Sequence, residues 1–153
     1  MKAITLYEPW ASLMAIGAKA NETRGSRTAH RGDICIHAAK ADVGFSDVLA
    51  VAAISAFRSR GFNFHLNFGC IVAVVEIWDV QPSEAFTFQG MDKMFLQIPL
   101  TSEEKVFGNY APGRFIYRTR NLRRLKTPVP CRGFQCVGWT VPADVEAKIK
   151  LQL

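Results

Sequence analysis

The chain has 153 residues, of which 49% are hydrophobic and 21% charged, and its net charge at pH 7 is +6. These values are typical of one ordinary globular domain and argue against a disordered chain. Because there is neither a secretory signal pattern nor an apolar stretch of the roughly 18 residues that a membrane span needs, we expect a cytoplasmic, monomeric protein without membrane contact.

A strand and a capped helix are predicted at the start of the chain. Residues 2–6 alternate apolar and polar side chains, as a half-buried strand does. Pro9 suits the first turn of a helix, and the apolar positions that begin at Trp10 recur at helical spacing. Gly17 can adopt the left-handed conformation that ends the helix.

Three charged residues, Lys19, Glu22 and Arg24, follow this helix within six positions. On an extended segment Glu22 and Arg24 share a face, and Lys19 can reach over them from the turn. One interpretation is a solvated, self-paired cluster on the surface. The other is a polar site at the mouth of a small barrel, where the carboxylate orients the cations toward an anionic or amide-bearing ligand. Residues 30–32, with Arg31, would form a second rim of that mouth.

The next elements are a strand over residues 33–39 and a helix over residues 46–60. Ser46 can cap this helix. Its predicted apolar stripe consists of Leu49, Ala53, Ile54 and Phe57. His37 lies within the strand, where it is either hydrogen-bonded in place or in contact with a ligand. Residues 62–68 interleave Phe with Asn and His, which fits a loop folded onto the barrel or a loop that stacks bases.

Residues 69–80 form the strongest predicted strand, a nearly continuous β-branched run that should be central and covered on both faces. Glu76 interrupts it. A buried carboxylate without a partner is costly, so Glu76 must find a cation or lie where the barrel opens. We expect Lys19 or Arg24 as the partner, which makes Glu76 either a functional carboxylate or half of a structural ion pair.

Residues 81–110 are less regular, and we expect them to close the barrel or cover its entrance. Within them, Thr101 and Glu104 have the spacing of a capping box for a short helix that ends near Gly108. The remaining predicted elements are a strand over 114–120, an extended edge fixed by Pro128 and Pro130, a strand over 135–141 and a terminal helix over 142–153.

About six strands with three or four inserted helices predict an α+β fold, a small mixed β-barrel with helices packed around it. We expect a single domain over residues 1–153, with a core over about 2–141. Seven cations without an intervening acid lie between residues 114 and 132, namely Arg114, Arg118, Arg120, Arg123, Arg124, Lys126 and Arg132. Such a segment is typical of a phosphate-binding face, and the alternative is a solubilising surface run.

The four cysteines, Cys35, Cys70, Cys131 and Cys136, are scattered, and their spacing does not provide the converging pairs of a metal site. We therefore expect buried free thiols and no metal. The sequence contains no Walker loop, dinucleotide fingerprint, nucleophile elbow or zinc-deaminase pattern, so no cofactor is implied.

Four stretches carry a resemblance to a known family. They are P-W-A-x-L-x-x-x-G-x-K-x-x-E-x-R, R-G-x-I-x-I-H-A, F-G-N-Y-A-P-G-R-F-I-Y and P-V-P-C-R-G-F-Q. Together they resemble the ASCH domain family, a branch of the PUA-like β-barrel superfamily, over roughly residues 2–140. The resemblance implies a barrel with a cleft beside the first helix, in proteins mostly thought to bind RNA or other nucleic acid. Some members are enzymes, including an amidohydrolase of acetylated cytidine and a ribonuclease.

Our first functional hypothesis is a module that binds RNA or another single-stranded nucleic acid, with a base or modified nucleoside in the cleft and phosphates on the arginine-rich face. The predicted binding residues are Trp10, Lys19, Glu22, Arg24, Arg31, His37, Arg114, Arg118, Arg120, Arg123, Arg124 and Lys126.

The second hypothesis is a hydrolase of nucleosides or RNA that uses Lys19 with Glu22 or Glu76. The amidohydrolase branch uses a lysine, a threonine three residues later and a distant glutamate. Here Glu22 stands where that threonine is expected, and Thr23 is one residue off, which in an extended segment would point it to the other face. For the ribonuclease branch, His37 and Lys19 are chemically permissible as acid and base. A protein-interaction domain ranks third.

Overall fold

The computed structural model describes residues 1–87 and 98–153. Part of the irregular segment predicted at 81–110 therefore lies outside the described residues. The strands are β1 (Lys2–Leu6), β2 (Asn21–Arg24), β3 (Gly32–Ala38), β4 (Cys70–Pro82), β5 (Phe115–Pro130) and β6 (Trp139–Thr140). The helices are α1 (Trp10–Ala15), α2 (Asp47–Ser59), α3 (Glu84–Thr87), α4 (Ser102–Phe107) and α5 (Ala143–Lys150).

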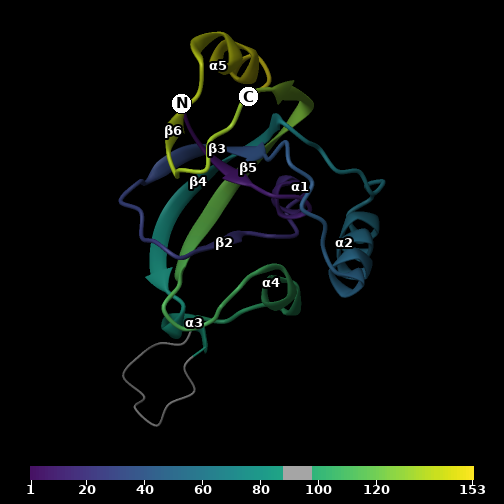
Figure 1. Cartoon of the computed structure of the whole chain (residues 1–153), viewed down its shortest axis with the longest axis vertical. Helices are drawn as coiled ribbons and strands as arrows, with labels where there is room; N and C mark the ends of the chain where they lie inside the picture. The colour runs from purple at the N-terminus through teal and green to yellow at the C-terminus, as the bar shows by residue number, and fades with distance from the viewer. Residues whose placement is uncertain (88–97) are drawn as a thin grey trace.

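The six described strands form one mixed sheet in the order β2-β5-β4-β3-β1-β6 (Figure 1). β1 and β3 are parallel, and the other neighbouring pairs are antiparallel. The α+β class is confirmed. A closed barrel is not, because β2 and β6 stand at the two ends of the strand order, and in the described parts of the chain they do not pair with each other.

The predicted central position of β4 is confirmed, because apolar cores cover both of its faces. On one face, Val72 and Val75 of β4 belong to a cluster that includes Met14 of α1. On the other, Val74 belongs to a cluster that includes Ile149 of α5. Full burial of one such side chain stabilises a fold by about 1.5–3 kcal/mol. The two cores therefore fix α1 and α5 on opposite faces, and both chain ends lie beside α5 (Figure 1).

The residues predicted to end the first helix and to begin the second, Gly17 and Ser46, act as expected. Gly17 ends the segment after α1 with a φ of 76°, and the Ser46 hydroxyl accepts a hydrogen bond from the Leu49 N–H at 3.2 Å. The predicted stripe of α2 needs one correction. Ile54 is 38% exposed, and Ala56 is buried in its place, since the packed face turns toward Phe57 and Phe107.

The C-terminal strands differ from expectation in length. β5 runs on to Pro130, and after Arg118 it pairs with β4 alone, so the predicted proline-containing edge is confirmed. The last strand is restricted to Trp139–Thr140, because residues 135–138 make a turn in which Gly138 has a φ of 75°. No helix in the described ranges is long and apolar enough to cross a membrane.

Candidate functional site

A cleft of about 370 Å³ lies between the end of β1, helix α1, strand β2 and the end of α4. Its wall includes Tyr7, Trp10, Lys19, Glu22, Thr23, Arg24, Asn109, Arg114 and Gln135. Trp10 is partly buried and also packs against the apolar cores. The structure therefore brings together the aromatic and charged residues that the sequence places on either side of the first helix.

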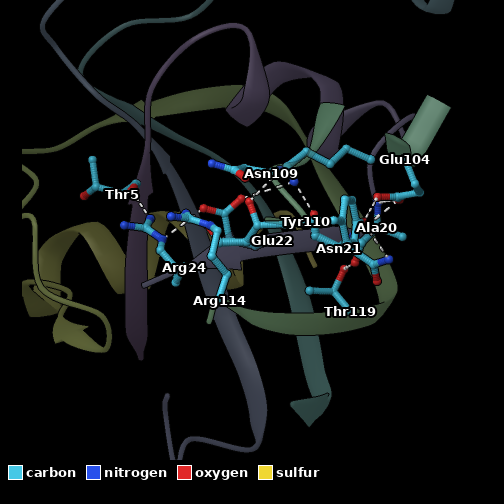
Figure 2. Close-up of polar contacts among 12 residues, drawn as sticks. Thr5, Ala20, Asn21, Glu22, Arg24, Glu104, Asn109, Tyr110, Arg114 and Thr119 are labelled. Atoms are coloured by element: carbon cyan, nitrogen blue, oxygen red, sulfur yellow. Dashed lines mark hydrogen bonds and ion pairs between the residues drawn. The ribbon is translucent and has the colours of Figure 1, made fainter. Parts of the chain in front are cut away.

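A charged triad of Lys19, Glu22 and Arg24 lies in this wall. Lys19 is only 2% exposed, and its ammonium donates to the Asn21 carbonyl and lies 3.3 Å from Glu22 Oε2. The other carboxylate oxygen, Glu22 Oε1, lies 2.9 Å from Arg24 Nε. Figure 2 shows Glu22 and Arg24 facing each other. The cluster is thus self-paired, but it is withdrawn from solvent into a cleft, where ion pairs are screened less than at an open surface.

Arg24 and Arg114 are held in the wall by backbone carbonyls. Arg24 Nη2 donates to the Thr5 carbonyl at 2.5 Å, and Arg114 Nη2 donates to the Thr23 carbonyl at 3.0 Å (Figure 2). The Thr23 hydroxyl accepts from the Asn109 N–H at 3.1 Å. These contacts join β1, β2, the residue directly before β5 and the segment after α4 around one cavity.

Glu104 supports the triad and was not recognised as a site residue from the sequence. The predicted capping box is half formed, because the Thr101 hydroxyl accepts from the Glu104 N–H at 3.1 Å. The Glu104 carboxylate, however, accepts hydrogen bonds from the N–H groups of Ala20 and Asn21, at the start of β2 (Figure 2). Glu104 is buried, so this contact between distant segments fixes the position of the residues beside Lys19.

Tyr110 contacts the other carboxylate oxygen of Glu104. Its hydroxyl donates to Glu104 Oε2 at 3.2 Å and accepts from Asn21 Nδ2 at 3.1 Å. Burial raises the pKa of the Tyr110 hydroxyl, which keeps it a hydrogen-bond donor. Gly108 allows the ring to lie close, since a Cβ at this position would be 2.5 Å from Tyr110 Cε2.

Glu76 lies elsewhere, and its predicted pairing with Lys19 or Arg24 is wrong. The register of β4 and β5 places Arg120 opposite Glu76, and the two side chains form a bidentate pair at 2.7 and 3.0 Å. Hydrogen bonds from Arg120 and then Asn121 lower the pKa of Glu76. Glu76 does not line the cleft, so the structure does not bring it to Lys19 and Glu22.

The arginine-rich segment is less positive in the fold than in the sequence. Three of its cations meet acids from neighbouring strands in the pairs Arg118–Asp79 at 3.3 Å, Arg120–Glu76 at 2.7 Å and Arg123–Asp33 at 2.6 Å. Arg118 also lies 4.3 Å above the Trp78 ring. The prediction of an unpaired single-sign face is therefore wrong for these three residues, because antiparallel pairing brings acids from β3 and β4 beside them.

The remaining cations of the segment lie at three different places. Arg114 lines the cleft, while Arg124 and Lys126 line a separate hollow, with Arg124 stacked 4.2 Å from the centre of the Phe62 ring. Arg132 lines a third cavity. Within the described residues, none of these four has a carboxylate within ion-pair distance.

His37 lies outside the cleft, in the wall of that third cavity. Its Nε2 is 2.9 Å from the Cys131 carbonyl, which can only accept, so Nε2 carries the hydrogen. Burial lowers the pKa of His37 and favours the neutral ring. Nδ1 is then an acceptor, 3.2 Å from the Thr5 hydroxyl. Both nitrogens are used within the protein, so His37 is hydrogen-bonded in place.

Two other predictions concern Arg31 and the cysteines. Arg31 is exposed, and its guanidinium donates to the carbonyls of Thr28 at 3.2 Å and His30 at 2.9 Å, away from the cleft wall. All four cysteines are free. Cys35 and Cys70 are buried as expected, but Cys131 is partly exposed and Cys136 is exposed. Among the described residues, no group of three His, Cys, Asp or Glu side chains could hold a metal ion.

Comparison with known proteins identifies the family. The family model of the ASCH domain matches residues 4–120, which span β1 to the first part of β5 and include the whole charged triad. The chain therefore belongs to the ASCH domain family, as its motifs predict. A search of curated proteins finds no match.

Proposed function

We propose that this protein binds single-stranded RNA, with one base held in the cleft by Lys19, Glu22, Arg24 and Trp10. The observation that supports the proposal most strongly is the ion pair between the buried Lys19 and the partly buried Glu22, in the wall of a cleft. A charged pair withdrawn from water has a desolvation cost, and a protein tolerates that cost most readily where the charges have further partners. The ASCH family is generally associated with RNA binding, which agrees with this reading.

Hydrogen-bond capacity remains in the triad after its internal contacts are made. The Lys19 ammonium has three N–H donors, and its described contacts go to the Asn21 carbonyl and the Glu22 carboxylate. The Glu22 carboxylate has about four acceptor positions. Donors and acceptors thus stand side by side, which suits a base edge that carries an amino group next to a carbonyl or ring nitrogen. Trp10 provides an aromatic wall on which such a base can stack.

We propose that the phosphates of the bound RNA contact the cations that have no acidic partner. Arg114 lies in the cleft, and Arg124, Lys126 and Arg132 lie on neighbouring surfaces. Contacts between these cations and phosphates release counterions, so binding should weaken as salt rises. Arginine suits this role because its planar guanidinium binds phosphate with two parallel hydrogen bonds.

The test is to incubate the protein with a mixed pool of short RNA, short single-stranded DNA and acetylated nucleosides, and to analyse the pool and the retained fraction by mass spectrometry. We expect RNA to be retained without new products, and retention to be lost in Lys19→Met. Lys105→Met, at an exposed position on α4, is the matched control and should retain RNA. New products that require Lys19 would show a hydrolase instead. Equal retention of RNA by both variants would exclude the cleft as the binding site.

A further inference from the structure

A second cavity of about 560 Å³ lies beside the cleft, and we call it the adjacent pocket. Both cavities are lined by Thr5, Tyr7 and Gln135, and Gln135 Nε2 donates to the Tyr7 hydroxyl at 3.3 Å. The two cavities therefore share one wall. The volume of the adjacent pocket is within the roughly 300–1,000 Å³ that small-molecule sites occupy.

Thr5 makes hydrogen bonds on both sides of the wall that the two cavities share. Its carbonyl accepts from Arg24 on the side of the cleft, at 2.5 Å. Its hydroxyl, on the side of the adjacent pocket, accepts from Trp139 Nε1 and contacts His37 Nδ1, both at 3.2 Å. The carbonyl and the hydroxyl of Thr5 are thus both hydrogen-bonded, one on each side of the shared wall.

Close packing supports the opposite side of the adjacent pocket. A Cβ on Gly133 would lie 2.2 Å from His37 Cε1, so only glycine allows the segment after Cys131 to lie against the His37 ring. The next residue, Phe134, packs edge-on against Trp139, with ring centres 5.6 Å apart. The segment from Cys131 to Gln135 is thereby held over the sheet, although it has no regular secondary structure.

The surface of the adjacent pocket combines exposed aromatic rings with positive charge. Tyr7, Phe68 and Phe134 are 38%, 41% and 50% exposed and all line the pocket. Lys40 and Arg132 also line it, and among the described residues no carboxylate does. Aromatic faces stack on bases, and unpaired cations bind phosphate. The combination therefore suits a ligand that carries both a planar ring and an anionic group.

We propose that the adjacent pocket is a second nucleotide subsite, which binds the nucleotide next to the one in the cleft. The base packs against Phe68 and Phe134, and the phosphate contacts Lys40 and Arg132. Tyr7 and Gln135 form the ridge over which the strand passes from one subsite to the other. This inference rests on the proposed function, because it assigns the ligand of the adjacent pocket by continuity with the cleft.

The test is an NMR titration of isotopically labelled protein with a mononucleotide and then with a tetranucleotide of the same base. Gly108 lines the cleft and Gly133 lines the adjacent pocket, so their amide signals report on the two subsites separately. We expect the mononucleotide to shift Gly108 and the tetranucleotide to shift both. The deoxy form of the tetranucleotide separates recognition of RNA from recognition of any single strand, and a shift of Gly133 that accompanies the shift of Gly108 supports the subsite with either form.

Two variants test the stacking and the phosphate contact. Phe134→Ala should weaken tetranucleotide affinity by about 5- to 150-fold, which corresponds to the 1–3 kcal/mol of one stacked base, and leave mononucleotide affinity unchanged. Arg132→Gln should reduce the salt dependence of tetranucleotide binding. Val51→Ala, at an exposed position on α2, is the control and should match the wild type in both measurements.

The outcomes separate this inference from the proposed function. If the tetranucleotide shifts Gly108 alone and Phe134→Ala binds it as tightly as the wild type, the second subsite is wrong and the cleft proposal stands. If neither the mononucleotide nor the tetranucleotide shifts the Gly108 signal, the proposed function itself is wrong, and the second subsite is wrong with it.

Discussion

The carboxylate of Glu104 accepts a hydrogen bond from the backbone N–H of Ala20, and this contact joins α4 to the residue directly before β2. A second bond at 3.2 Å links Glu104 to the N–H of Asn21. The buried Lys19 directly precedes these two residues. The geometry of the cleft thus depends on a side chain that does not line it.

Removing the Glu104 carboxylate should therefore lower both stability and binding. Glu104→Ala leaves the two N–H groups at the start of β2 without their partner, and we expect the free energy of unfolding to fall by about 1–3 kcal/mol. Urea unfolding measures the first effect and RNA affinity the second. Glu103→Ala is the control, because its partly exposed pair with Arg60 should contribute about 0–1 kcal/mol. Equal losses in the two variants would contradict the role of Glu104.

Gly133→Ala should destabilise the fold through a steric clash. The added Cβ would lie 2.2 Å from the His37 ring. The ring cannot move away without disturbing its hydrogen bond to the Cys131 carbonyl. We expect a loss of about 1–3 kcal/mol in thermal or urea unfolding. Gly25→Ala is the matched control, since a Cβ there meets nothing within 4 Å. A Gly133→Ala protein as stable as Gly25→Ala would show that the segment is not held against His37.

His37 should make the fold less stable as the pH falls. Burial lowers its pKa in the folded state, whereas in the unfolded chain its pKa is about 6.5. Below about pH 6.5 the unfolded state takes up a proton that the folded state does not, so the free energy of unfolding falls until the folded pKa is reached.

The measurement is urea unfolding of the wild type and of His37→Asn at about pH 7.5 and about pH 5.5. We expect the wild type to lose more stability between these values than the variant does. Glu8, whose pKa is raised by burial, acts with the opposite sign but is common to both proteins. An identical pH dependence would mean that His37 takes up a proton as readily in the folded protein as in the unfolded chain.

The cations without acidic partners should dominate the salt dependence of RNA binding. Arg124→Ala and Lys126→Ala should each lower the slope of log affinity against log salt by about 0.7, the value for one phosphate contact on a single strand. Arg120→Ala should change the slope less, because Glu76 already neutralises that guanidinium. Affinity titrations at several salt concentrations decide this, and equal slopes for all three variants would contradict the assignment.

Local signals predicted much of the fold. Ser46 and Gly17 act through their own backbone, and the β-branched run of β4 requires cover on both faces, so these features could be read from the sequence. The triad could be predicted as well, because Lys19, Glu22 and Arg24 are near neighbours in the chain and share a short strand and turn.

Contacts that depend on strand register could not be predicted. The sequence shows Glu76 and the arginines of β5, but which of them face each other is set by bulges between the two strands. For the same reason the three neutralised arginines were not foreseen. Glu104 matched a capping box, and its true partners are backbone groups some 80 positions earlier, which carry no side-chain signal in the sequence.

The most direct test of the central claim is the RNA affinity of Glu22→Gln, measured by fluorescence anisotropy with a labelled single strand. This change removes one negative charge, so binding by general electrostatic attraction would become tighter. If Glu22 instead accepts from a base in the cleft, affinity should fall by about 10- to 150-fold, as for a lost charged hydrogen bond of 1.5–3 kcal/mol. Glu76→Gln makes the same change of charge outside the cleft and should not weaken binding. Equal or tighter binding by Glu22→Gln would contradict base recognition in the cleft.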